Sequence, residues 1–261
     1  MKIFVINLKS DVKRLQRILT QFKKFNIVDF EIVEAINGRQ LSESQINQHY
    51  DKNAASFIIR ELGPTEIACA LSHIEVCNRI IKYNKRCLVI EDDVLLTKEF
   101  KNFVNIEIDD SSDIIFFGLY TSNCEYKKPK LYQYKNIRYS INHAGNITRC
   151  YLEKSYTTLG GINFYDIDEH SVKHDIFHGT HAYAPSVNAC HKIIKSNYPV
   201  KMMADYVWVS SNLSFKISKH NIIEVDHSLQ SNITSDRDKA IARSTYSELY
   251  MNRVNNIYHN K

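Results

Sequence analysis

The chain has 261 residues, a formal net charge of +5 and 44% hydrophobic residues, a composition typical of a soluble globular protein. It is long enough to bury a sizeable core, as one large domain or as a domain with an appendage. Basic residues are scattered and form no stripe interleaved with aromatic residues, which gives no support to binding of nucleic acid.

No apolar run in the sequence approaches the roughly 18 residues of a membrane-spanning helix, and the apolar run after Met1 is too short for a secretion signal. The six cysteines form no C-x-x-C pair, and most of them lie in apolar patterns that indicate reduced thiols. We therefore expect a cytoplasmic protein. Its mildly basic charge permits contact with an anionic membrane surface.

The first 35 residues predict one βαβ unit. An apolar run from Ile3 to Leu8 predicts a first strand, and Phe30 to Ala35 predicts a second. Between them apolar residues recur at helical spacing, and Asn26 is a residue type that suits a helix end. A strand, a crossover helix and a second strand imply parallel pairing and an α/β fold.

A long helix is predicted in the middle of the first half. Residues 39–60 form a polar connection with no clear secondary-structure signal, and Gly63-Pro64 then interrupts the chain. The amphipathic pattern that follows predicts a helix to about residue 83. This helix leads into a short apolar run, Cys87 to Ile90, which is typical of a buried strand.

The second half contains apolar strands separated by a long polar segment. Asp113 to Gly118 predicts a strand, Thr180 to Ala184 predicts another, and a helix should follow to about Lys195. Residues 120–178 are rich in Tyr, Asn, Lys and His, and their poor periodicity predicts hairpins and long loops. Such loops commonly form lids or acceptor-binding regions. Ile222 to Val225 predicts a late strand.

Three carboxylates, Glu91-Asp92-Asp93, follow the apolar run that ends at Ile90. Burying an unpaired carboxylate is costly, so they should lie at the carboxyl end of a strand, the edge of an α/β sheet that binds ligands. Alternation along a strand predicts Glu91 and Asp93 on one side and Asp92 on the other. Our hypothesis is that Asp93, helped by Glu91, holds Mg²⁺ or Mn²⁺ against a nucleotide diphosphate. A solvated acidic turn is the alternative.

Two further residues carry hypotheses about chemistry. His227 follows the late strand and could be a second protein ligand to the metal, although a single histidine after a strand is more commonly a surface residue. Asp205 lies between apolar residues and an aromatic-rich run, and such a carboxylate could act as the general base that deprotonates an acceptor hydroxyl. A helix N-cap is an equally good interpretation of Asp205.

His170, His174, His178 and His181 recur at spacings of four, four and three, which resembles a zinc-binding helix. No H-E-x-x-H motif accompanies them and acidic residues lie among them, so we do not predict a zinc site. The chain also lacks a P-loop, a G-x-G-x-x-G motif and a G-x-S-x-G motif, which disfavours NTPase, dinucleotide-binding and α/β-hydrolase functions.

Several short motifs occur together along the chain. They are Ile6-Asn7-Leu8 with Arg14, Ala35-Ile36-Asn37-Gly38, the segment Leu62 to His73, Val89 to Asp93, and Gly179 to Tyr183. As a set they resemble glycosyltransferase family 25, which includes lipooligosaccharide galactosyltransferases of Gram-negative bacteria and is similar to the collagen galactosyltransferases. The resemblance extends from residue 1 to about residue 230. The G-x-x-E-I-x-C-x-x-S-H segment is specific in combination with the E-D-D strand end.

The resemblance implies an α/β, GT-A-like nucleotide-binding fold with a central mostly parallel sheet and a β- and loop-rich acceptor region. It also implies UDP-galactose as donor, dependence on Mn²⁺ (or Mg²⁺) and inversion at the anomeric carbon. The metal ligands it suggests are Asp93 and Glu91, with His227 added from the hypothesis above, and the base is Asp205. The residues expected to bind the nucleotide sugar are Asn7, Leu8, Arg14, Ala35, Asn37, Ser72, Glu91 and Asp92.

We therefore expect residues 1–235 to form the transferase domain, with 120–178 on its acceptor side, and residues 236–261 to form a basic polar tail with a helical pattern. The expected partners are a nucleotide-sugar donor and an oligosaccharide acceptor on the lipid A core, and the tail permits contact with the inner face of the inner membrane. Two alternatives are a transferase that uses UDP-glucose or a UDP-N-acetylhexosamine, and a catalytically silent nucleotide- or carbohydrate-binding protein.

Overall fold

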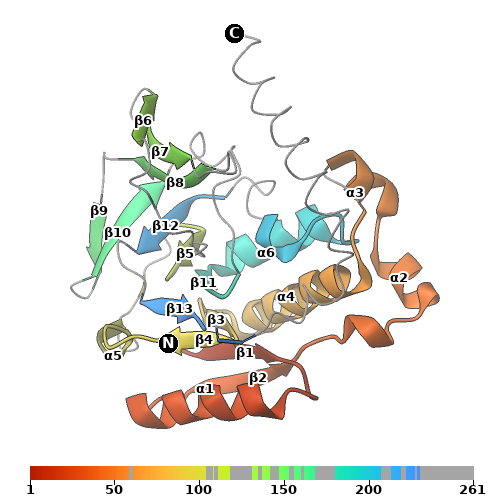
Figure 1. The fold of residues 1–261 in the computed structure, drawn as a ribbon, viewed down its shortest axis with the longest axis horizontal. Helices are drawn as coiled ribbons and strands as arrows, with labels where there is room; N and C mark the ends of the chain where they lie inside the picture. Colours follow the sequence, from red (N-terminus) through yellow and green to blue (C-terminus); the bar gives the residue numbers. More distant parts are fainter. Residues whose placement is uncertain are drawn as a thin grey trace.

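The chain folds around a mixed sheet with helices on both faces (Figure 1). The computed structural model describes residues 1–58, 61–103, 108, 111–117, 131–134, 137–141, 147–152, 156–159, 162–167, 180–206, 213–218, 222–226 and 228–229. The main sheet has eight strands in the order β2-β1-β3-β11-β5-β12-β10-β9. Helix α1 covers one face, and α4 and α6 lie side by side on the other. The predicted α/β class is confirmed.

The predicted βαβ unit is present at the start of the chain. Strand β1 (Ile3–Asn7) pairs in parallel with β2 (Phe30–Glu34), and α1 (Val12–Phe25) forms the crossover. Helix α1 ends at Asn26, which adopts the left-handed conformation with φ of 56° that Asn tolerates. Both faces of β1 are buried, as expected for a strand with helices on both sides.

Helix α4 (Pro64–Tyr83) brings the chain back to β3 (Leu88–Glu91), which pairs with β1 in parallel. Helices α2 (Glu43–His49) and α3 (Lys52–Ile58) lie in the polar connection for which no helix is predicted from the sequence. Both are seven residues long, too short to present a clear amphipathic pattern. The parallel order of these first strands places the carboxyl ends of β2, β1 and β3 at one edge of the sheet.

The remainder of the main sheet is mostly antiparallel. Strand β11 (Ala182–Pro185) runs antiparallel to both β3 and β5 (Ile114–Phe116), between which it lies. Strand β12 (Phe215–Ser218) is parallel to β5, and β10 (Ile162–Ile167) and β9 (Tyr156–Leu159) extend the sheet with antiparallel pairs. The expectation of a mostly parallel sheet is therefore wrong, because β11 enters from the opposite edge and a hairpin completes the far end.

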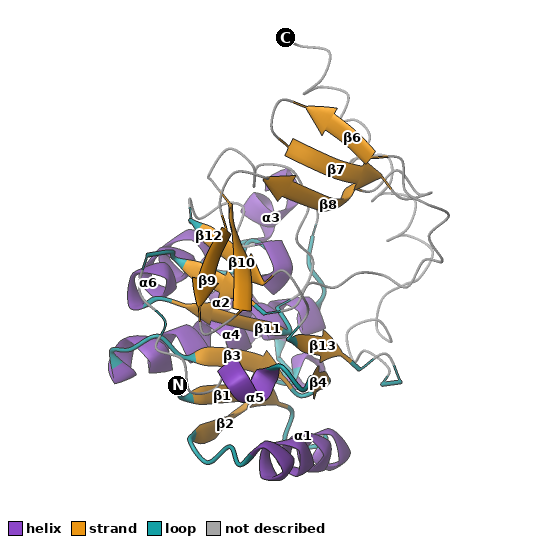
Figure 2. Cartoon of the chain, turned by 90° about the vertical axis from the view of Figure 1, so that its left-hand side faces the viewer, coloured by secondary structure: helices purple, strands orange, loops and turns teal. Residues whose placement is uncertain are grey.

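Two smaller sheets lie beside the main one. Strand β4 (Val94–Leu96) pairs with β13 (Ile223–Val225), and β6 (Leu131–Tyr134), β7 (Ile137–Ile141) and β8 (Ile147–Leu152) form an antiparallel sheet beyond β10 (Figure 2). Strands β6 to β10 confirm the hairpins predicted between the strands of the second half; their acceptor-binding role stays a prediction.

Short helices complete the described structure. Helix α5 (Phe100–Phe103) follows β4, and α6 (Val187–Asn197) follows β11 as predicted. Among the helices that the structure describes, none has both the length and the apolar character needed to cross a membrane. The tail 236–261 lies outside the described residues, so the domain division at residue 235 stays a prediction.

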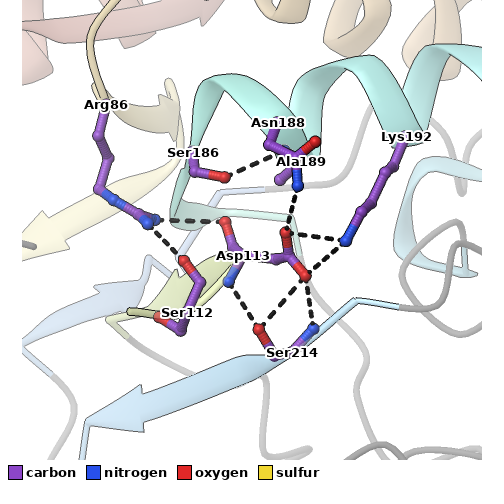
Figure 3. Close-up of polar contacts among 8 residues, drawn as sticks. All are labelled: Arg86, Ser112, Asp113, Ser186, Asn188, Ala189, Lys192 and Ser214. Atoms are coloured by element: carbon purple, nitrogen blue, oxygen red, sulfur yellow. Dashed lines mark hydrogen bonds and ion pairs between the residues drawn. The ribbon is translucent and has the colours of Figure 1, made fainter. Parts of the chain in front are cut away.

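Asp113 organises the edge of the sheet at which β5 begins (Figure 3). Its carboxylate accepts hydrogen bonds from the Ser214 N–H at 3.0 Å and from Lys192 Nζ at 3.0 Å, with Asn188 Nδ2 at 3.4 Å. Burial alone would raise the pKa of Asp113, but the hydrogen bonds from Ser214 and Lys192 and the charge of Lys192 outweigh it, so this pKa is lowered.

Arg86 ties three segments together at the same edge (Figure 3). Its guanidinium is buried and donates to the carbonyl oxygens of Ala184 at 2.6 Å, Asp113 at 3.3 Å and Ser112. The start of β3, the start of β5 and the end of β11 are thereby joined by one side chain. Arg86 thus supplies donors to carbonyl oxygens at this edge, and the Asp113 carbonyl also accepts from the Ser186 N–H at 2.8 Å.

Candidate active site

A pocket of about 380 Å³ opens at the edge where β2, β1 and β3 end. This is the edge at which open α/β sheets bind ligands. A second pocket, of about 500 Å³, shares part of its wall. The sequence-predicted residues that line the first pocket are Leu8, Arg14, Ala35, Asn37, Ser72, Glu91, Asp92 and Asp93. The structure therefore brings together side chains from three strand ends and two helices.

Asp92 is fully engaged by the protein itself. Its Oδ2 accepts a hydrogen bond from Asn7 Nδ2 at 2.6 Å, and its Oδ1 accepts one from Arg14 Nη1 at 2.9 Å. Burial raises the pKa of Asp92, and Arg14 and Asn7 oppose that effect. Asp92 lines the pocket and Asn7 does not, so the contribution of Asn7 is to hold Asp92, which in turn holds Arg14 and the start of α1 in place.

Asp93 is the carboxylate with the fewest protein donors at this edge. Its Oδ2 lies 3.6 Å from Arg14 Nη1, and its buried Oδ1 has no hydrogen-bond partner in the described part of the chain. Burial and the neighbouring charges of Glu91 and Asp92 raise the pKa of Asp93 to about 7. The expected alternation of the three side chains is wrong, because β3 ends at Glu91 and both Asp92 and Asp93 turn toward Arg14.

Glu91 faces the other way, toward β11 and α4. Its Oε1 accepts a hydrogen bond from Thr180 Oγ1 at 2.5 Å and lies 3.5 Å from His73 Nε2. Burial would raise the pKa of Glu91, but His73, Thr180 and His181 outweigh it and lower this pKa to about 2. Glu91 is therefore ionised at neutral pH, whereas its neighbour Asp93 takes up a proton readily.

Asp205 lies close to Glu91 without lining the described pocket. It belongs to a short 3₁₀ turn, η2 (Ala204–Tyr206), and its Oδ1 accepts from the Thr180 N–H at 2.9 Å, with Thr180 Oγ1 at 3.2 Å. The same threonine thus contacts both Glu91 and Asp205. The residues that an N-cap would serve, 207–210, lie outside the described residues.

The wall opposite the acidic residues is the loop after β2. Ser72 Oγ accepts a hydrogen bond from the Ile36 N–H at 2.9 Å and donates to the Ala68 carbonyl at 2.7 Å, which anchors the loop on α4. A Cβ on Gly38 would lie 2.5 Å from Thr65 Cα, so only glycine permits this close approach to the start of α4. Ser72 therefore both lines the pocket and anchors the loop that forms part of its wall.

Residues that sequence reasoning did not place in the site include His73, Thr180 and Arg39. His73 and Arg39 line the pocket, and Thr180 binds Glu91. His73 and Thr180 belong to the motifs that carry the family resemblance, and this was the signal that could have identified them. Arg39 follows directly after the Ala35-Gly38 motif and carried no signal beyond its position.

The metal-ligand hypotheses stay predictions. His227, His170, His174 and His178 lie outside the described residues; His181 is described and its carbonyl accepts a hydrogen bond from the Glu91 N–H at 3.1 Å. Among the described residues, no group of three or more His, Cys, Asp or Glu side chains is arranged to hold a metal ion. The buried Asp93 Oδ1 and the surplus of carboxylates fit an ion held by one or two carboxylates, with phosphate and water as further ligands.

Comparison of the sequence with known proteins covers the segment that forms the pocket. A family model described as glycosyltransferase family 25 (LPS biosynthesis protein) matches residues 1–208. The chain belongs to glycosyltransferase family 25. The part of this family 25 chain that the model matches contains the whole pocket lining and Asp205, and it ends before His227.

Relatives of this family 25 chain are similar over part of their length. A glycosyltransferase 25 family member of Aedes aegypti is 30% identical over 126 residues, covering 44% of this chain and 21% of the mosquito protein. Human procollagen galactosyltransferase 2 is 30% identical over 166 residues, covering 61% of this chain and 25% of the human protein. A Haemophilus influenzae protein with a provisional name as a glycosyltransferase is 32% identical over 132 residues, covering 49% and 44%. The chain thus matches less than half the length of each.

Proposed function

We propose that this chain is an inverting glycosyltransferase that moves galactose from UDP-galactose to a sugar of lipooligosaccharide. The observation that carries the proposal is the pocket at the ends of β2, β1 and β3, with the carboxylates Glu91 to Asp93 in its wall, inside the segment matched by the family model. The name of the human relative supports galactose as the transferred sugar, and the family description supports a lipopolysaccharide-type acceptor.

Asp93 and Glu91 are the residues we propose to hold a divalent cation, Mn²⁺ or Mg²⁺. Asp93 has an oxygen that lacks a donor within the described residues, whereas both oxygens of Asp92 are bound by Asn7 and Arg14. His227 is a further proposed ligand. When bound, such an ion supplies positive charge that stabilises the departing diphosphate.

Asp205 is our proposed general base. The reaction requires the proton of the acceptor hydroxyl to move to a carboxylate while the hydroxyl oxygen forms a bond to the anomeric carbon. The bond between that carbon and the diphosphate oxygen breaks on the opposite side, which inverts the configuration and releases UDP. Asp205 lies beside Glu91, at the edge of the sheet where the donor pocket opens, so an acceptor approaching from the β11 side would meet it.

Release of UDP from a panel of donors tests the proposal. UDP-galactose, UDP-glucose and UDP-N-acetylhexosamines are offered with and without Mn²⁺, together with a truncated lipooligosaccharide acceptor. We expect UDP-galactose to be turned over fastest and only with a divalent ion present. Asp205→Asn should lower kcat by about 100-fold or more, the usual contribution of a general base. Asp93→Ala should abolish the dependence on the metal ion together with most of the activity.

Glu75→Ala is the matched control, because Glu75 lies on α4 with 45% of its side chain exposed, and its partner is Arg79 on the same helix. It should leave turnover unchanged. Stabilisation of the protein by UDP and Mn²⁺ without UDP release from any donor would identify a nucleotide-binding protein in place of an enzyme. Full metal-dependent activity in Asp93→Ala would refute the metal assignment, and faster turnover of another UDP-sugar would refute galactose.

A further inference from the structure

His73 is a buried histidine in the wall of the candidate pocket. It belongs to α4, is 4% exposed and lines the pocket together with Glu91. Its Nδ1 lies 2.8 Å from the hydroxyl of Tyr183, a fully buried residue of β11. Its Nε2 lies 3.5 Å from Glu91 Oε1. The ring therefore stands between a buried phenol and a carboxylate that we propose as a metal ligand.

The two neighbours of the His73 ring determine which of its nitrogens carries a proton. An ionised carboxylate only accepts hydrogen bonds, so the nitrogen that faces Glu91, Nε2, is the one that carries hydrogen. In the neutral ring Nδ1 is then an acceptor, and the Tyr183 hydroxyl donates to it. The hydrogen bond at one ring nitrogen thus fixes the state of the other. Tyr183 holds the ring with its Nε2–H directed at Glu91.

His73 Nε2 is buried and has no hydrogen-bond partner among the residues that the structure describes. Buried polar groups almost always have a partner, so each exception requires an explanation. The distance of 3.5 Å to Glu91 Oε1 is long for a hydrogen bond, and contacts in a site without its ligands are often long and shorten when the ligands bind. A small movement of the Glu91 carboxylate toward α4 would complete this bond.

Both side-chain contacts of the Glu91 carboxylate fall on the same oxygen. Thr180 Oγ1 donates to Oε1 at 2.5 Å from the β11 side, and His73 faces Oε1 from α4. The Glu91 side chain is 27% exposed and lines the pocket, and Oε2 is not among its buried atoms that lack a partner. Two groups from different elements therefore engage Oε1, and Oε2 is the oxygen available to a ligand in the pocket.

We propose that His73 is a positioning residue for the cation site: its Nε2–H, oriented by Tyr183, holds Glu91 Oε1 so that Oε2 is directed at a divalent ion in the pocket. This inference rests on the proposed role of Glu91 as a metal ligand and deepens it. Thr180 engages the same oxygen independently, so loss of His73 should weaken the site without abolishing it. Outer hydrogen-bond partners of metal ligands typically contribute about 10- to 100-fold to metal affinity, and we expect the lower value here.

Two substitutions at His73 separate the contributions of its two nitrogens. The amide of Gln reaches about as far as Nε2, so His73→Gln keeps a donor that faces Glu91. The amide of Asn reaches only about as far as Nδ1, so His73→Asn loses that donor. The dissociation constant of Mn²⁺ is measured at saturating UDP from the electron paramagnetic resonance signal of unbound Mn²⁺. We expect it to rise about 10-fold in His73→Asn and to stay within about threefold of the wild type in His73→Gln.

His49→Asn is the matched control. Its Nδ1 also lies 2.8 Å from a tyrosine hydroxyl, that of Tyr198, but His49 does not line the pocket. It should leave the affinity for Mn²⁺ unchanged. The affinity for UDP without metal should also be unchanged in each His73 variant, because the role assigned to His73 is in binding the ion.

Wild-type affinity for Mn²⁺ in His73→Asn, or equal losses in the Asn and Gln variants, would overturn the proposal. If His73→Asn does not fold, nitrogen-15 NMR of the unaltered protein tests the same arrangement: a proton on His73 Nε2 is expected, and a proton on Nδ1 alone would overturn it. If Glu91→Gln keeps wild-type affinity for Mn²⁺, the proposed metal ligand is wrong. If Glu91→Gln loses affinity and His73→Asn does not, only the positioning role of His73 is wrong.

Discussion

Two partly buried carboxylates at opposite edges of the same sheet have opposite environments. Asp113, where β5 begins, is bound by Ser214, Lys192 and Asn188, and its pKa is lowered. Asp93, beyond the end of β3, has one oxygen without a donor in the described chain, and its pKa is raised to about 7. Asp113 and Asp93 both lie next to the end of a strand in the sequence. The difference between their pKa values therefore comes from the hydrogen-bond donors around each carboxylate.

The two buried arginines of these edges differ in the same way. Arg86 directs its guanidinium at backbone carbonyl oxygens, which carry no net charge. Arg14 is shared among Asp11 at 3.2 Å, Asp92 at 2.9 Å and Asp93 at 3.6 Å, so carboxylates outnumber the cation. At one edge Arg86 and the Asp113 carboxylate find their partners within the protein and stabilise the fold. The other keeps a surplus of negative charge, which is the mark of a ligand site.

Removal of Arg86 should have the largest effect on stability. Arg86→Met keeps most of the side-chain volume and removes the Arg86 donor from the carbonyl oxygens of Ala184 and Ser112, at a cost of about 1–3 kcal/mol each when nothing replaces it. The Asp113 carbonyl keeps the Ser186 N–H at 2.8 Å. We expect the free energy of unfolding to fall by about 4 kcal/mol, with a decrease in Tm of roughly 10 °C. Thermal and urea denaturation measure this loss, and UDP release per folded molecule should remain that of the wild type.

Arg79→Met is the control for that experiment. Arg79 pairs with Glu31 and Glu75, but its side chain is 38% exposed, and surface ion pairs contribute less than about 1 kcal/mol. A loss at Arg86 no larger than the loss at Arg79 would contradict the structural role of the Asp113 edge. A large drop in turnover per folded Arg86→Met molecule would contradict the separation of the two edges.

Asp93→Asn should stabilise the protein, the reverse of Arg86→Met. Because the pKa of Asp93 is about 7 in the folded state and near 3.8 in an unfolded chain, the folded state binds the extra proton between these values, and stability falls as the pH rises through them. The amide avoids this penalty. Without metal, we expect the variant to exceed the wild type by about 2 kcal/mol at pH 8 and to match it near pH 4. If Asp93→Asn is less stable than the wild type at pH 8, the site does not hold a surplus of negative charge.

The parts of this fold that follow from local pattern were predictable. Strands β1, β2 and β3 and helices α1 and α4 are long apolar or periodic segments, and their parallel order places the strand ends together. The direction of β11 was not predictable from the sequence. The neighbours with which a strand pairs depend on tertiary packing, which the residues of that strand do not encode.

The candidate site was predictable to a similar extent. Residues that follow strands, such as Leu8 and Asp93, lie where their position in the chain implies, whereas Asn7 supports Asp92 without lining the pocket. Which carboxylate is satisfied was not predictable, because Glu91 accepts a hydrogen bond from Thr180, 89 residues away, and lies 3.5 Å from His73 Nε2 on a helix. The expected alternation failed for a local reason: the strand ends at Glu91, and a turn does not preserve the period of two.

Asp113→Asn should have the smallest effect, with a sign opposite to that of Asp93→Asn. The pKa of Asp113 is lowered in the folded state, so its contribution to stability is present above the ordinary pKa near 3.8 and is lost as the pH falls through the lower folded value. The amide retains one acceptor for the Ser214 N–H and loses the charge partner of Lys192. We expect the variant to be less stable by about 1–2 kcal/mol at pH 7, with the difference shrinking below pH 4. Denaturant midpoints measured from pH 3 to pH 8 test this directly. If the two amide variants shift stability in the same direction at pH 7, the donors around each carboxylate do not determine its role, and the contrast between the two edges of the sheet fails.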